Sequence, residues 1–101
     1  MEFKIEKSNE TVISLTRKIG YQPMGVLNEE YNIVRPLSKE GYPRFHIYIK
    51  KDSKSGVFVF NLHLDQKKAS YRGFASHSGE YMGELVEREV QRINNILKDI
   101  K

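Results

Sequence analysis

The chain of 101 residues is long enough for one small domain but too short for two independent hydrophobic cores, so we expect residues 1–101 to form a single domain. Hydrophobic residues make up 39% and charged residues 30% of the sequence, which is typical of a soluble globular protein. The absence of cysteine excludes disulfides, thiolate metal sites and cysteine nucleophiles. No apolar run approaches the roughly 20 residues of a membrane span, and residues 1–10 lack the apolar core of a signal peptide, so we expect a cytoplasmic protein.

The net charge of +4 is concentrated in the middle of the chain. From Arg35 to Arg72 there are nine basic and three acidic residues, whereas the two flanking segments together carry a net charge of −2. Clustered cations favour polyanions because they release the counterions that are condensed on phosphates. The middle segment is therefore consistent with a nucleic-acid-binding face, and equally with an ordinary solvated surface of lysines.

The N-terminal part of the chain contains one predicted helix. Residues 1–7 alternate apolar and polar side chains over too short a length to distinguish an edge strand from a loose arm. From Ser8 or Asn9 to Ile19, apolar residues recur at helical spacing. Ser8 and Asn9 are favourable N-caps and Gly20 follows the last turn, so the sequence predicts a helix of about three turns.

Three strands are predicted in the middle of the chain. Tyr31–Leu37 is the first, and Pro36 near its end indicates an edge strand or a strand terminus. Arg44–Lys50 alternates apolar and polar residues almost strictly and is the second. The turn residues DSKSG separate it from Phe58–Asp65, the third strand, so these two strands are predicted to form a β-hairpin.

The register of this hairpin decides which side chains share its exposed face. The apolar residues of both strands face the core only if the numbers of paired residues have an odd sum. A sum of 109 leaves a four-residue loop, which is a common hairpin length and places His46 opposite His63; a sum of 107 is the alternative. In either register the exposed face gathers the same six residues: Arg44, His46, Tyr48, Asn61, His63 and Asp65.

The last 20 residues form the second predicted helix. One apolar stripe runs along it at spacings of three and four residues: Val86, Val90, Ile93, Leu97 and Ile100. The preceding segment, residues 66–82, has no clear periodicity and is longer than most loops, which favours a functional or a mobile segment over a simple connection. The predicted fold is α+β in the order helix-strand-strand-strand-helix, with both helices on one face of a three-stranded antiparallel sheet.

The two histidines of the exposed face favour acid–base chemistry, because imidazole gives or takes a proton near neutral pH. Cleavage of RNA through its own 2′-hydroxyl needs a base, an acid and nearby cations, and it needs no metal. We therefore predict His46 and His63 as a catalytic pair, the alternative being that both are ordinary exposed strand residues. The residues predicted to contact nucleic acid are Arg44, Tyr48, Lys50, Asn61, Lys67, Lys68 and Arg72.

Two further interpretations concern the loop and metals. Aromatic and basic residues are interleaved in residues 66–82, which suits base stacking on single-stranded nucleic acid and equally suits packing of the loop on the domain. A metal site with nitrogen and oxygen ligands would use His46, His63, Asp65 and His77. That spacing is unspecific, so we predict no metal and no other cofactor.

Three short segments resemble the HicA toxins, small endoribonucleases of toxin–antitoxin systems with a fold like that of the double-stranded RNA-binding domain. ISLTRKIGY is similar to the end of that family's first helix, RFHIYI to its strand that opens with a catalytic histidine, and FNLHL to a third strand that often ends in histidine. The resemblance implies RNA as substrate, His46 in the catalytic position, His63 at the strand end and an antitoxin-like protein partner. A non-catalytic domain that binds a protein or a nucleic acid is the alternative function. The sequence does not predict an oligomeric state.

Overall fold

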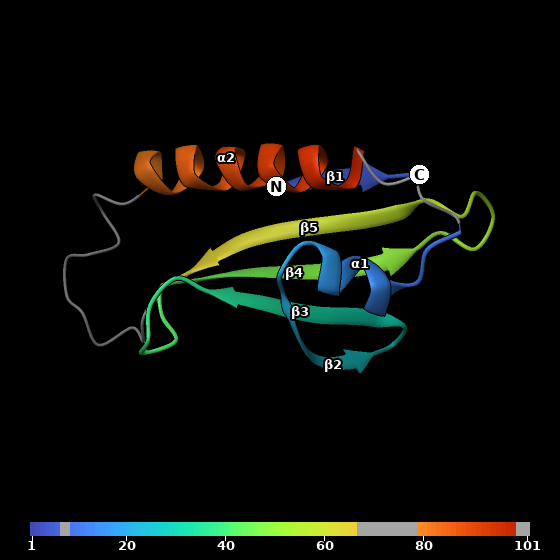
Figure 1. The fold of residues 1–101 in the computed structure, drawn as a ribbon, viewed down its shortest axis with the longest axis horizontal. Coiled ribbons are helices and arrows are strands. Elements are labelled where there is room, and N and C mark those ends of the chain that lie inside the picture. Colours follow the sequence, from blue (N-terminus) through green and yellow to red (C-terminus); the bar gives the residue numbers. More distant parts are fainter. Residues whose placement is uncertain (7–8, 67–78, 99–101) are drawn as a thin grey trace.

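Figure 1 shows the computed structural model of the protein, which describes residues 1–6, 9–66 and 79–98. The elements follow in the order β1 (Glu2–Ile5), α1 (Val12–Lys18), β2 (Gln22–Leu27), β3 (Glu30–Pro36), β4 (Arg44–Lys51), β5 (Phe58–Asp65) and α2 (Gly79–Lys98). All five strands form one antiparallel sheet in the order β1-β5-β4-β3-β2. In Figure 1, α2 runs alongside β5.

The predicted three-stranded sheet is wrong, as is the predicted order helix-strand-strand-strand-helix. The sheet has five strands because β1, ahead of the first helix, pairs with β5, and because β2, after that helix, pairs with β3. Pro23 and Gly25 obscure β2 in the sequence, since both residue types are depleted in strands. The structure accommodates them with a β-bulge, which appears as a register shift between these two residues.

The predicted β4–β5 hairpin is confirmed together with its register. Its pairs run from Arg44 with Asp65 to Lys51 with Phe58, so the paired numbers sum to 109. The backbone N–H of Asp52 donates to the carbonyl oxygen of Val57 at 2.8 Å and closes the predicted loop of residues 53–56. Gly56 ends that loop with a φ of 75°, a conformation that glycine adopts without strain.

Both helices differ from their predicted bounds at the N-terminal end. α1 begins at Val12 instead of near Ser8, because the side chain of Thr11 is the N-cap and accepts from the backbone N–H of Ser14 at 3.0 Å. α2 begins at Gly79, inside the segment predicted as a loop. No helix in the described part of the chain is long and apolar enough to span a membrane.

One hydrophobic core joins the two helices to a single face of the sheet, which we call the inner face. The buried residues of this core include Leu15 and Ile19 near α1, Ile93 and Leu97 of α2, and Ile47 at the centre of the sheet. We call the opposite face the outer face. Because side chains alternate along a strand, it carries the residues between the buried positions of β4 and β5.

A buried carboxylate ties α2 to the rest of the core. Glu89 is 3% exposed and accepts from the hydroxyl of Tyr21 at 2.6 Å and from the Nε and Nη2 of Arg92 at 2.7 and 2.8 Å. Arg35 of β3 donates to the same carboxylate at 3.3 Å. Burial and the neighbouring Glu89 raise the pKa of Tyr21 far above its ordinary value, and the hydrogen bonds to Glu89 raise the pKa of Arg92. We call these four residues the Glu89 cluster.

Candidate functional site on the outer face

The six residues predicted to share one face do lie together on the outer face. β4 contributes Arg44, His46 and Tyr48, which alternate with buried Phe45, Ile47 and Ile49. The register then places Asp65, His63 and Asn61 of β5 directly opposite them in the same order. The hydrophobic effect fixes this arrangement, since a shift by one residue would turn the apolar set of a strand out of the core.

His46 has a hydrogen-bonding partner at each ring nitrogen, and 14% of its side chain is exposed. Its Nδ1 lies 3.0 Å from Oδ2 of Asp65, and its Nε2 lies 3.0 Å from Oδ1 of Asn32. The same Asp65 oxygen accepts from Nε of Arg44 at 3.2 Å. A carboxylate thus holds both an imidazole and a guanidinium, and we call Asn32, Arg44, His46 and Asp65 the Asp65 cluster.

Asn32 is a site residue that the sequence analysis missed. It lies on β3, where the pairing of Asn32 with Tyr48 turns its side chain to the outer face. A side-chain amide presents either an acceptor oxygen or a donor NH₂ group, so Asn32 can pair with Nε2 of His46 whether the ring is protonated or neutral. The missing signal was the β3–β4 register, because the sequence predicted both strands but not their pairing.

Aromatic rings form a row across β4 and β5. The ring of Tyr48 stacks on His46, with centroids 4.5 Å apart and planes inclined by 28°. His63 meets the same tyrosine edge-on, with centroids 5.7 Å apart. Although His46 and His63 are paired in the backbone register, each histidine ring contacts Tyr48, which therefore links the predicted catalytic pair.

The charges of the outer face balance in the described part of the chain. The register places three cations there, Lys4, Arg44 and Lys50, and three carboxylates, Glu2, Glu30 and Asp65. The basic middle of the sequence does not become one basic surface, because Arg35 binds Glu89 on the inner face and Lys54 lies in the hairpin loop. Three further predicted contacts, Lys67, Lys68 and Arg72, fall outside the described residues.

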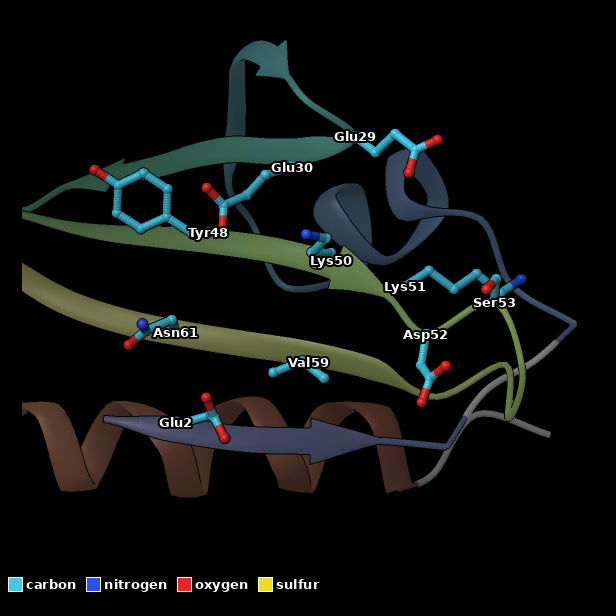
Figure 2. Close-up of a pocket in the computed structure, with 10 residues that line it drawn as sticks. All are labelled: Glu2, Glu29, Glu30, Tyr48, Lys50, Lys51, Asp52, Ser53, Val59 and Asn61. Carbon is cyan, nitrogen blue, oxygen red and sulfur yellow. The ribbon is translucent and has the colours of Figure 1, made fainter.

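Tyr48 and His46 of the ring row each line a hollow. The one drawn in Figure 2, about 530 Å³, lies toward the hairpin loop, where β1, β3, β4 and β5 all contribute to its lining. Tyr48, Lys50 and Asn61 line it together with the four carboxylates of Glu2, Glu29, Glu30 and Asp52. The second hollow, about 340 Å³, is lined by Asn32, Arg44, His46 and residues 24–27 of β2. It is the space into which the Asp65 cluster opens.

The alternative metal site is not assembled from described residues. Within residues 1–6, 9–66 and 79–98, no group of three or more histidine, aspartate or glutamate side chains is placed to hold a metal ion. Asp65 contacts His46 and Arg44, and His63 contacts Tyr48. His77, the fourth ligand of that interpretation, lies outside the described residues.

The outer face thus combines an oriented imidazole, a row of rings and the hollows beside His46 and Tyr48. No protein-family model, curated protein or solved structure matches this chain.

Proposed function

We propose that the outer face binds single-stranded RNA. The observation that carries this proposal is the row of rings formed by His46, Tyr48 and His63 on a sheet face that the two helices leave free. Single-stranded nucleic acids bind to such faces by stacking their bases on aromatic side chains, and each stacked base contributes about 1–3 kcal/mol. Tyr48 at the centre of the row is the principal platform.

Hydrogen-bonding groups beside the rings complete the binding face. The side chains of Asn32 and Asn61 lie next to His46 and Tyr48, where amides can pair with the edges of unstacked bases. Arg44 and Lys50 are the nearest cations for phosphates. Because the charges of the described outer face cancel, stacking and hydrogen bonding supply more of the affinity there than counterion release does.

Electrostatics also favours one end of the face over the other. The hollow of Figure 2 is lined by four carboxylates and two lysines, so a phosphate backbone is repelled near the hairpin loop. At the opposite end of β4, the guanidinium carbon of Arg44 lies 4.7 Å from the ring centroid of Tyr42, and the Arg44 side chain is 21% exposed. The RNA therefore lies across Tyr48 toward Arg44 and the second hollow.

A binding titration with a labelled single-stranded RNA tests this proposal. Tyr48→Leu keeps an apolar side chain in the strand but removes the π-face, so we expect Kd to rise about 5- to 150-fold. Tyr31→Leu is the matched control, since Tyr31 pairs with Ile49 and faces the helices. Unchanged affinity of Tyr48→Leu, or no affinity of the unaltered protein, would show that the proposal is wrong.

Cleavage of the bound RNA is a second candidate function, favoured by the hydrogen bond between Asp65 and His46. A carboxylate that fixes an imidazole is the arrangement that a general base requires. With Asn32 displaced, Nε2 of His46 would take the proton of the 2′-hydroxyl while that oxygen attacks phosphorus. The 5′-oxygen would leave with a proton from His63, and Arg44 would stabilise the charge on the phosphate.

This second candidate is tested by following a single-stranded RNA on a gel in the presence of a chelator. We expect His46→Ala to slow cleavage by at least about 100-fold. A DNA strand of the same sequence should stay intact, because it lacks the 2′-hydroxyl. If the unaltered protein binds the RNA without producing fragments, cleavage is wrong and the binding proposal stands.

The cytoplasmic location and the antitoxin-like partner that the resemblance to HicA toxins implies belong to the same proposal. Their support is the sequence, in the segments similar to that family. Cell fractionation tests the first, and growth arrest on expression, relieved by a neighbouring gene product, tests the second.

A further inference from the structure

The two edges of the sheet differ in how they are protected. An exposed edge strand can pair with another chain unless charged side chains or bulges oppose the pairing. β1 carries Glu2 and Lys4 among its four residues. β2 carries no charged residue, and its three large apolar side chains, Met24, Val26 and Leu27, are 57–71% exposed. The β2 edge is therefore the one open to association.

The turn that follows β2 determines which of its backbone groups are free. Asn28 and Glu29 both have positive φ, 51° and 64°, as in the tight two-residue turns of hairpins. In such a hairpin the residues that flank the turn, Leu27 and Glu30, exchange hydrogen bonds, and the next pair does not. The N–H and C=O of Val26 consequently point away from β3, toward the open edge.

We propose that two copies of this chain pair antiparallel through β2 around a two-fold axis at Val26. Each Val26 exchanges its two backbone hydrogen bonds with Val26 of the second copy, and Leu27 lies opposite Gly25 of the second copy. The sheet continues from one copy into the other, and both outer faces point to the same side. Pro23, which lacks an N–H, ends the pairing on the far side of the bulge.

Charge and shape favour a second copy as the occupant of this edge. A two-fold axis at Val26 places the residues nearest the axis close to their own counterparts, so a charge there would meet a like charge, and residues 21–28 have none. Gly25 and Leu27 both turn to the outer face, as shown by their pairing with Asn32 and Glu30. A Cβ at Gly25 would meet nothing within 4 Å, so the side chain of Leu27 of the second copy has room above it.

The pairing also completes the candidate site. Gly25 and Leu27 line the hollow of about 340 Å³ that holds His46, Asn32 and Arg44. In the dimer, Leu27 of the second copy covers Gly25 and adds an apolar wall to that hollow. Each site is then built from two copies of the chain.

Cross-linking at the axis gives the first test. The chain contains no cysteine, so Val26→Cys introduces a single thiol. Hydrogen-bonded antiparallel pairs have Cα atoms about 5.5 Å apart, within the range that a disulfide bridges. We expect mild oxidation to give a covalent dimer of Val26→Cys, whereas Leu37→Cys, at another exposed apolar position after β3, stays monomeric on a denaturing gel.

Sedimentation of the uncross-linked protein gives the second test. We expect a concentration-dependent dimer that Val26→Lys converts to monomer, because two ammonium groups then meet at the axis, while Leu37→Lys remains dimeric. A cooperative melting transition in each variant would establish that both are folded. A monomeric unaltered protein at all concentrations, a dimer that survives Val26→Lys, or a dimer in which Val26→Cys does not cross-link would each overturn the proposal. None of these measurements involves RNA, so they are independent of the proposed function.

Discussion

The Glu89 cluster and the Asp65 cluster use the same chemistry on opposite faces of one sheet. In each, a carboxylate accepts hydrogen bonds from a guanidinium and from a second polar group. Glu89 is 3% exposed and accepts four hydrogen bonds from three residues. The side chain of Asp65 is 32% exposed and accepts two hydrogen bonds.

This difference in burial predicts different contributions of the two clusters to stability. A buried carboxylate is stable only when its partners satisfy it, so the loss of any member of the Glu89 cluster destabilises the fold. A partly exposed carboxylate is partly hydrated, and its ion pairs contribute little to folding. We therefore expect the Asp65 cluster to exchange its partners for the proposed RNA ligand at little cost to the fold.

The largest loss of stability is expected from a substitution on the inner face. Glu89→Gln keeps the shape of the side chain but removes the negative charge that Arg35 and Arg92 share. We expect the free energy of unfolding to fall by about 3 kcal/mol, measured by urea titration. Glu87→Gln, an exposed position on the same helix, should change it by less than about 0.5 kcal/mol. Equal changes in the free energy of unfolding of the two variants would contradict a structural role of Glu89.

The next effect concerns Tyr21, whose hydrogen bond to Glu89 is 2.6 Å long. Tyr21→Phe should lower the free energy of unfolding by about 1.5 kcal/mol at neutral pH, since the acceptor of the lost hydrogen bond is charged. The pKa of Tyr21 is raised in the folded state, first by burial and then by Glu89, so the unfolded chain ionises first. This contribution is fully present below about pH 10, the ordinary pKa of tyrosine, and is lost as the pH rises above that value.

Unfolding measured between pH 8 and pH 11 isolates this contribution. The unaltered protein should lose stability above about pH 10 more steeply than Tyr21→Phe. The two curves should therefore converge at high pH. Parallel curves across that range would contradict the coupling between Tyr21 and Glu89.

A smaller effect on stability is expected at the outer face. Asp65→Asn removes the charge that His46 and Arg44 share, and the free energy of unfolding should change by less than about 1 kcal/mol. If the protein cleaves RNA as proposed, cleavage should nevertheless fall by at least about 100-fold, because the imidazole loses its orienting carboxylate. A loss of stability as large as that of Glu89→Gln would show that the two clusters have the same structural role.

The smallest effect on stability is expected at Asp52, a carboxylate that is fully exposed and thus more exposed than Asp65. The backbone N–H of Lys54, followed by the hydroxyl of Ser55, lowers the pKa of Asp52. The contribution of Asp52 to stability is present above about pH 4, the ordinary pKa of aspartate, and is lost as the pH falls below that value. Asp52→Asn should thus lower the melting temperature slightly at pH 7 and not at pH 2. An equal change in melting temperature at pH 7 and pH 2 would contradict this expectation.

The sequence predicted the parts of the fold that local patterns determine. Strict alternation and the length of the loop determine the β4–β5 hairpin, and the register that brought the six outer-face residues together follows from them. β1 escaped prediction because four residues carry little pattern and their pairing with β5 lies far along the chain. β2 escaped because its bulge accommodates residues that are depleted in strands.

The polar clusters were harder to predict, because each joins residues from distant segments. Asn32 reaches His46 only through the β3–β4 register, and Tyr21 reaches Glu89 across 68 positions in the sequence. One signal was present: Glu89 lies three residues after Val86 and four before Ile93, in the apolar stripe of α2. A charged residue at such a position indicates a buried partner.

The amide of Asn32 has a consequence for the choice of ligand. In the free protein it already satisfies Nε2 of His46, so a ligand that takes its place exchanges one hydrogen bond for another. A ligand with no hydrogen-bonding atom at that position would leave a mostly buried nitrogen without a partner, at a cost of about 1–3 kcal/mol. Competition with an internal amide would in this way discriminate between a hydroxyl-bearing sugar and its deoxy counterpart.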